Sequence, residues 1–163
     1  MSSYVSKGSS IRWRYQFHPR FTFKSGITVT GISALLEKET FNYFTDYTFS
    51  FNYKNLKYNF QLSAFFKQTG ERALYRGNYD ENENLSSIDE AFISGFRNMD
   101  VNLSVPVLKN KIVLGTGVHN IFNVKSIYSS GSLSPHSGGD GSTPIAWGRT
   151  FVFKINYRFI QYE

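Results

Sequence analysis

The chain has 163 residues and carries 18 Lys and Arg against 12 Asp and Glu, which gives a formal net charge of +6. The basic residues are scattered and form no contiguous patch, so the charge does not predict a nucleic-acid partner. Apolar residues make up 40% of the chain, which excludes a disordered tail, and cysteine is absent, which excludes a disulfide framework and thiolate metal sites.

The start of the chain is polar and holds no apolar segment of the kind that a secretory signal peptide contains. No run further along approaches the roughly 18 apolar residues of a membrane-spanning helix. For an exported protein, this pattern predicts either a removed N-terminus or a chain that is one segment of a longer polypeptide.

Apolar and polar residues alternate with a period of two, which is the pattern of β-strands with two different faces. In the first run, Trp13 and Tyr15 fall on one face, and Arg12 and Arg14 fall on the other. The alternation recurs in runs that cover residues 10–17, 21–30, 43–53, 58–67, 98–105, 112–119 and 150–159. We therefore expect about seven strands, of about the 9–11 residues that a tilted membrane strand needs.

The connections between these runs alternate between short and long. Short turns are predicted at His18-Pro19, Lys54-Asn55 and Lys109-Asn110, where Asn can supply a left-handed turn residue. Long connections are predicted at 33–42, 68–95 and 123–147. Short turns at one rim and long loops at the other are typical of outer-membrane barrels, whereas a soluble sandwich has no reason to sort its loops in this way.

Aromatic residues support the same interpretation. Phe, Tyr and Trp make up 18% of the chain, with 16 Phe and 11 Tyr. A soluble domain of this size would struggle to bury so many rings, whereas a lipid-facing wall with aromatic girdles requires them.

The fold class predicted is therefore all-β, an antiparallel transmembrane β-barrel segment of about seven strands. The smallest barrels have about eight strands, and an open sheet would leave two unpaired edges in lipid. We expect strands outside this chain to complete the barrel. In this interpretation residues 1–9 are an extracellular loop remnant, and residues 10–163 are the C-terminal part of a transmembrane β-barrel.

The polar positions of these strands are candidates for the wall of the barrel lumen. The charged candidates are Arg12, Arg14, Lys24, Asp46, Lys67, Asp100, His119, Lys154 and Arg158. Such a wall would hold a plug through salt bridges or guide an anionic ligand, and we favour the first role. His119 is expected to lie beside the plug.

No motif predicts an enzyme, a metal site or a cofactor. The three histidines, His18, His119 and His136, fall in a turn, on a polar face and in a loop, and no G-x-S-x-G nucleophile elbow is present. The acidic run at residues 80–84 has Leu85 where a calcium loop needs Gly, so we interpret it as a solvated loop tip. The glycine-rich run at 138–142 has no Lys in phosphate-loop spacing and is interpreted as an extracellular loop.

The last predicted strand carries aromatic or apolar residues at alternate positions. These residues are Phe151, Phe153, Ile155, Tyr157 and Phe159. The strand resembles the C-terminal signal by which outer-membrane proteins are recognised for barrel insertion, although four further residues follow Phe159.

The most specific resemblance covers residues 99–124, MDVNLSVPVLKNKIVLGTGVHNIFNV. This stretch resembles the penultimate hairpin of TonB-dependent transporters, in which a Lys-Asn turn is followed by a strand that ends in Gly-Val-x-Asn-Ile-Phe-Asn. The loop at 136–149 resembles Bacteroidota members of that family. The resemblance implies a barrel of about 22 strands with a plugged lumen, of which this chain would form roughly the last third.

The resemblance implies a location in the bacterial outer membrane and the import of a nutrient ligand, such as a glycan, a peptide or a metal chelate, into the periplasm. The implied partners are outer-membrane lipid, the remaining barrel strands and plug domain, TonB through the N-terminal part, and a surface lipoprotein lid. One alternative is a structural or assembly subunit of an outer-membrane complex without import activity. Another is a small outer-membrane enzyme whose other strands lie outside this chain.

Overall fold

The computed structural model of the chain describes residues 4–34, 40–79, 85–130 and 141–159. Within these ranges the protein is all-β, with eleven strands in chain order. No helix in the described ranges is long and apolar enough to cross a membrane.

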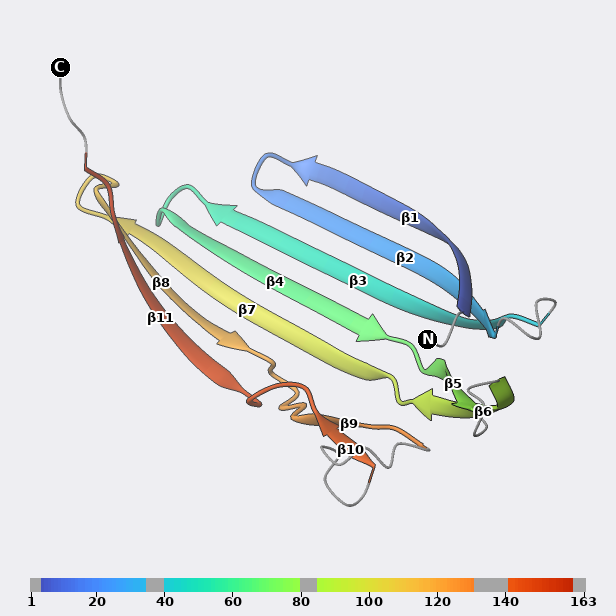
Figure 1. Cartoon of the computed structure of the whole chain (residues 1–163). Coiled ribbons are helices and arrows are strands. Elements are labelled where there is room, and N and C mark those ends of the chain that lie inside the picture. The colour runs from blue at the N-terminus through green and yellow to red at the C-terminus, as the bar shows by residue number, and fades with distance from the viewer. Residues whose placement is uncertain (1–3, 35–39, 80–84, 131–140, 160–163) are drawn as a thin grey trace.

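Seven of the strands form one antiparallel sheet in the order β1-β2-β3-β4-β7-β8-β11 (Figure 1). They are β1 (Tyr4–His18), β2 (Phe21–Ala34), β3 (Asn42–Asn55), β4 (Phe60–Thr69), β7 (Phe96–Val107), β8 (Ile112–His119) and β11 (Thr150–Tyr157). The sheet is a single curved layer that is not closed, and β1 and β11 form its two edges. The predicted all-β class and the seven antiparallel strands are confirmed.

The remaining four strands form two small hairpins inside the connections. β5 (Arg72–Tyr79) pairs with β6 (Leu85–Ile93), and β9 (Ser126–Tyr128) pairs with β10 (Ser142–Pro144). The long connections predicted at 68–95 and 123–147 therefore contain short strands that the sequence analysis did not predict. Pairing within each connection satisfies backbone groups that a plain loop would leave to water.

Two boundaries also differ from the prediction. β1 begins at Tyr4 and pairs with β2 from Tyr4↔Ala34 onward, so residues 4–9 are strand and not the expected loop remnant. β3 continues through Lys54-Asn55, and the turn follows it, with Asn59 at a φ of 48°. The turn predicted at Lys109-Asn110 is present, with φ values of 55° and 67° at these two residues.

The connections are sorted between the two ends of the sheet. Figure 1 shows the β1–β2, β3–β4 and β7–β8 turns at one end, which we call the short-turn end, together with the end of β11. The opposite end carries the β2–β3 connection and both small hairpins, and we call it the long-connection end. The predicted sorting of short and long connections is confirmed.

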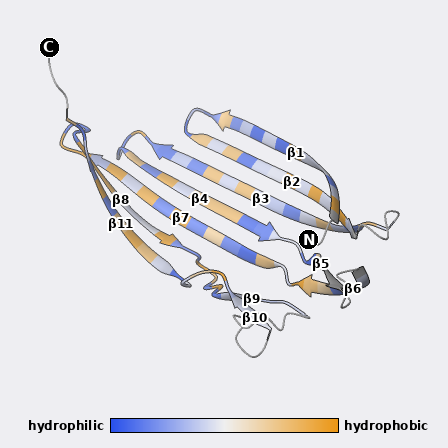
Figure 2. Ribbon diagram, in the orientation of Figure 1, coloured by the Kyte–Doolittle hydropathy of each residue, from blue (hydrophilic) through white to orange (hydrophobic). Residues whose placement is uncertain are grey.

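The register between strands keeps apolar residues on one face and polar residues on the other. One cross-strand row joins Tyr15, Phe23, Phe51, Ala64 and Val101. The row beside it, on the opposite face, runs Arg14↔Lys24↔Ser50↔Phe65↔Asp100, and Phe65 is its one apolar member. Figure 2 shows the resulting alternation of hydrophobic and hydrophilic residues along the strands.

Aromatic rings touch across the strands of the apolar face. Phe21 stacks on Tyr53 at a centroid distance of 4.6 Å, and Phe49 lies 6.1 Å from Phe66. Phe122, which follows β8, meets Phe66 edge-on at 6.2 Å. Aromatic cross-strand pairs each stabilise a sheet by about 0.2–1 kcal/mol relative to Ala pairs. These contacts lie within the layer and cover little of the face.

The sheet has no hydrophobic core of the usual kind. Ala91 is the only buried hydrophobic residue among the described residues, whereas Trp13, Phe151 and Phe153 are 68%, 77% and 70% exposed. The accessible surface is 12263 Å² for a chain of 18.7 kDa, while a compact protein of that mass exposes about 8,300 Å². No described segment of the chain therefore covers the apolar face.

Two glycines of β8 test the packing between strands. A Cβ at Gly117 would lie 2.9 Å from the Val101 carbonyl oxygen and would overlap the Asn102 side chain. A Cβ at Gly115 would find Lys154 Cβ at an ordinary 3.4 Å. We expect Gly117→Ala to destabilise the sheet by about 1–3 kcal/mol, and Gly115→Ala to be neutral or slightly stabilising. The check is the thermal midpoint in detergent micelles followed by circular dichroism, and equal midpoints for the two variants would contradict the register.

Candidate functional site

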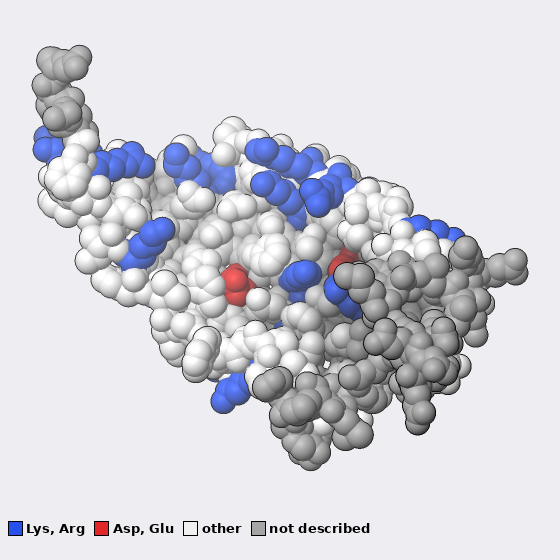
Figure 3. Space-filling model, viewed as in Figure 1, with Lys and Arg blue, Asp and Glu red and all other residues white. Residues whose placement is uncertain are grey.

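The polar face carries a group of cations at its β1 side. Arg12 and Arg14 lie on β1, Lys24 lies opposite Arg14 on β2, and Lys67 lies on β4 opposite Thr48. We call Arg12, Arg14, Lys24 and Lys67 the basic cluster. None of the four forms an ion pair with a described residue. Figure 3 shows basic side chains gathered along β1 and β2 and along the short-turn end, with acidic side chains only in isolated spots.

A shallow hollow opens within this cluster. Its volume is about 250 Å³, and its polar-face lining includes Arg12, Arg14, Lys24, Thr48 and Ser50. Lysine and arginine side chains supply hydrogen-bond donors and no acceptors. The hollow therefore suits a carboxylate or another anion supplied by a partner.

The acidic groups of the polar face have partners within the chain. Asp46 Oδ2 accepts a hydrogen bond from Arg72 Nη2 at 3.1 Å, and Asp46 Oδ1 accepts one from the Gly70 N–H at 3.0 Å. The Arg72 guanidinium also lies 4.8 Å from the centre of the Phe44 ring. Asp46 thus anchors the start of β5 to the sheet, a role that the sequence did not predict.

Asp100 lies on β7 and has the equivalent role for the residues that end and follow β8. Its Oδ1 accepts a hydrogen bond from the Asn120 N–H at 2.8 Å, and its Oδ2 lies 3.3 Å from His119 Nδ1. The side chain of His119 is 45% exposed. The Asp100–His119 pair fixes the point where the chain leaves β8.

Asn120 is the centre of a tight turn in residues 117–123, which we call the GVHNIFN segment. Its φ is 53°, its Nδ2 donates to the Val124 carbonyl at 2.7 Å, and its Oδ1 accepts from the Val124 N–H at 3.0 Å. Asn123, with a φ of 59°, accepts from the Arg149 N–H at 3.0 Å through its Oδ1. The Arg149 guanidinium donates to the Ile121 carbonyl through Nε and Nη2. These bonds join the turn after β8 to the start of β11.

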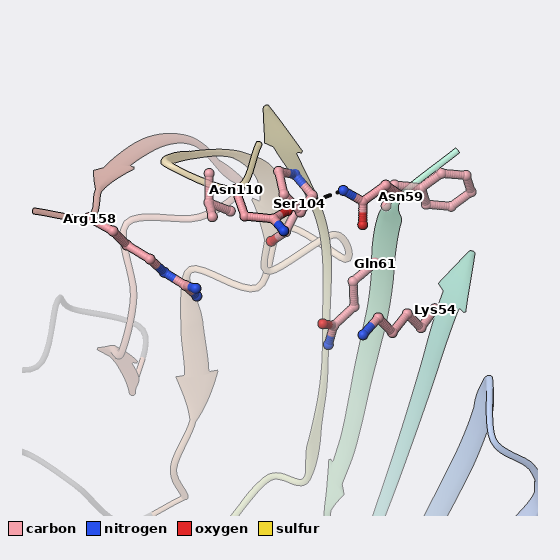
Figure 4. A pocket seen from close by; sticks show the side chains of 9 residues that line it. Lys54, Asn59, Gln61, Ser104, Asn110 and Arg158 are labelled. Carbon is pink, nitrogen blue, oxygen red and sulfur yellow. Dashed lines mark hydrogen bonds between the residues drawn. The ribbon is translucent and has the colours of Figure 1, made fainter. Parts of the chain in front are cut away.

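A second hollow lies on the polar face at the short-turn end, and Figure 4 shows it. Its volume is about 330 Å³, and its lining residues are Lys54, Asn59, Phe60, Gln61, Ser104, Pro106, Asn110, Val113 and Arg158. The predicted lumen residue Arg158 is part of it, and its backbone N–H donates to the Lys111 carbonyl at 2.9 Å. Lys54 was missed because the sequence placed it in a turn. Lys154 lies on the same face of β11, opposite Gly115.

The alternating aromatic and apolar residues of the last strand lie on one face of β11, which is an edge strand of the sheet. Phe151, Phe153, Ile155 and Tyr157 alternate along β11, and all are more than half exposed. Phe159 follows them and meets the Tyr157 ring edge-on at 4.6 Å. This geometry leaves the strand accessible to a partner that recognises alternate apolar side chains.

The described residues hold no group of three or more His, Asp or Glu side chains that could bind a metal ion. His18 lies in the β1–β2 turn, where its Nδ1 accepts a hydrogen bond from the Arg20 N–H at 3.1 Å. His136, the acidic run at 80–84 and residues 138–140 of the glycine-rich run lie outside the described residues. What the described geometry supplies is a group of cations on one face and exposed apolar side chains on the other.

Comparison with protein-family models, with curated proteins and with solved structures finds no match to this chain.

The turn at Asn120 gives a direct test of the joint between β8 and β11. Asn120→Ala removes both bonds to Val124 and places a Cβ-bearing residue without a bonding side chain at positive φ. We expect it to destabilise the protein by about 1–3 kcal/mol. Asn120→Gly loses the same bonds but accepts the backbone conformation, so its loss should be smaller. Thermal unfolding in micelles measures both, and a wild-type midpoint for Asn120→Ala would contradict the assigned role.

Proposed function

We propose that this chain forms part of the wall of an outer-membrane β-barrel, and that the barrel belongs to a TonB-dependent transporter that imports a nutrient ligand into the periplasm. The observation that carries the proposal is the two-faced single layer, with an exposed aromatic face, a charged opposite face and connections sorted by length. The GVHNIFN segment and the aromatic last strand add the family resemblance. The role is binding and transport rather than catalysis.

Lipid is the cover that fits the apolar face. Soluble monomers rarely expose a contiguous apolar patch larger than a few hundred Å², whereas this face is apolar from Ile11 on β1 to Phe153 on β11. The last strand, Thr150–Tyr157, rises about 24 Å at 3.4 Å per residue. At the tilt of about 35–45° that barrel strands have, this rise spans about 17–20 Å of the apolar band of about 25 Å in outer-membrane barrels.

The open edges require more strands. In lipid each unpaired backbone N–H or C=O costs several kcal/mol, so both β1 and β11 need partners on their free sides. Every residue of β11 is exposed, as expected for an edge that awaits a neighbour. In the proposed barrel, strands outside this chain pair with both edges.

The charged face then lines the lumen, where a plug domain fits the basic cluster. Acidic side chains on the plug would pair with Arg12, Arg14 and Lys67, which lack ion-pair partners among the described residues. TonB would act on the plug from the periplasm, at the short-turn end. The long-connection end would face outward, where it captures the ligand and where a lipoprotein lid would dock.

Adjacent residues of β11 test the lipid assignment. Phe153 lies on the apolar face and Val152 on the polar face, opposite Gly117. Arg at Phe153 should cost about 2–4 kcal/mol in mid-membrane and reduce the amount of assembled protein. Arg at Val152 introduces the same side chain one residue away and should be tolerated. The measurement is protein abundance in isolated outer membranes, and equal abundance of the two variants would refute the sidedness.

Import is tested at the long-connection end. Deletion of residues 132–140, which lie outside the described residues and leave the β9–β10 pairing intact, should leave membrane abundance normal and reduce ligand uptake, since binding residues concentrate in such connections. Normal abundance with unchanged uptake would exclude this connection as the capture site. If the complete protein shows no uptake of any nutrient ligand, the same wall serves an assembly subunit and the importer proposal fails.

A further inference from the structure

The hollow at the short-turn end is formed by parts of the chain that lie far apart in sequence. Lys54 comes from the end of β3, Gln61 from β4, Ser104 from β7, and Arg158 follows β11. Asn59 and Asn110 come from two different turns, and Asn59 Nδ2 donates to Asn110 Oδ1 at 3.3 Å. In Figure 4 Arg158 reaches in from one side and Lys54 from the other, with the amide side chains between them.

The charge of this hollow is positive and is not balanced locally. Lys54 and Arg158 are its two cations, and its lining residues include no carboxylate. The short-turn end around it carries only basic charges among the described residues. These further cations are Arg20, Lys57, Lys109 and Lys111. A concave site with one sign of charge concentrates ions of the opposite sign.

We propose that this hollow is an oxyanion site that takes a phosphate group. Arginine presents a planar fork that binds two phosphate oxygens at once, and lysine adds a point charge. Gln61, Asn59 and Asn110 supply amide groups, and Ser104 supplies a hydroxyl. Two cations and several neutral donors match a dianion with four acceptor oxygens better than a carboxylate, which has one charge and two oxygens. The volume of about 330 Å³ lies at the lower limit of ligand pockets, so the ligand is a phosphate ion or a small phosphate ester.

This inference goes beyond the proposed transport function and does not depend on it. The hollow is formed by the strands and turns of this chain alone, so it does not require a plug or an imported ligand. The phosphate group has two possible sources, which are a soluble phosphate ester and the headgroup of an anionic phospholipid. Both use the same chemistry, and the experiment separates them.

The test uses the full chain in dodecyl maltoside micelles at about 150 mM salt, where exposed charges more than about 8 Å apart are largely screened. Inorganic phosphate and glycerol 3-phosphate are titrated separately, and phosphatidylglycerol is added to the micelles in a third series. Binding is followed by phosphorus NMR. We expect saturable binding of one phosphate group per chain. Saturation by the soluble probes assigns a soluble ester, and saturation by phosphatidylglycerol alone assigns the lipid headgroup.

Charge-matched variants separate the hollow from the general charge of the short-turn end. Lys54→Gln and Arg158→Gln should each bind about tenfold more weakly, as expected for loss of one charge-assisted hydrogen bond. Lys57→Gln and Lys111→Gln remove the same charge from neighbouring positions that do not line the hollow, and should stay within about twofold of wild type at this ionic strength. Arg158→Lys keeps the charge without the fork and should lie between wild type and Arg158→Gln.

Circular dichroism must show the same β-sheet signal and thermal midpoint in each variant. Both Arg158 substitutions retain the backbone hydrogen bond from residue 158 to the Lys111 carbonyl, so these two variants should fold normally. The proposal is overturned if no probe binds saturably to the wild-type chain. It is also overturned if the Lys57 and Lys111 variants weaken binding as much as the Lys54 and Arg158 variants, since that result would mean diffuse attraction without a site.

Discussion

The pairing register of the seven-stranded sheet is the constraint on which the rest of the structure depends. Successive side chains of a strand point to opposite faces, so a shift of one residue between two strands would exchange their faces. From β2 to β11 each neighbouring pair keeps one continuous register, and β1 shifts register only next to the first turn, between Tyr15 and His18. The aromatic face and the charged face both follow from this one regularity.

The same register explains why the sheet holds a shape without a second layer. Each strand forms a backbone ladder with its neighbours, and the rings of Phe21, Tyr53, Phe49 and Phe66 add contacts along the layer. Neither source of stability covers the apolar face. In water that face would drive association with whatever apolar surface it met. The stability of this chain is therefore inseparable from its cover, which is lipid in the proposed barrel.

The features that sequence alone predicted are those set by local patterns. Alternation located all seven main strands, because the contrast between residues such as Trp13 and Arg14 repeats along each strand. What the sequence did not predict depends on contacts across long separations. The bond from Arg72 to Asp46 and the joining of Lys54 with Arg158 in one hollow require the strand order, which no local period encodes. Asn120 was noticed as part of a motif, but its positive φ and its two bonds to Val124 became visible only in three dimensions.

The positive charge of the polar face depends on which groups its two carboxylates bind. Asp46 and Asp100 are the carboxylates of that face in the main sheet, and each is held by a backbone N–H and by a second group from this chain. They join connections to strands, and neither forms an ion pair with a cation of the basic cluster. Arg12, Arg14, Lys24 and Lys67 thus remain without ion-pair partners among the described residues, as do Lys54 and Arg158 at the short-turn end. Five of these six cations are exposed and Lys67 is half-buried. Cations gathered without local anions attract ions of the opposite sign, so both places favour ligands or partners that bring negative charge. The two places differ in shape. The basic cluster is spread over β1, β2 and β4 and suits several acidic side chains of a protein, whereas the hollow at the short-turn end receives its two cations from opposite sides and suits the compact anion proposed for it.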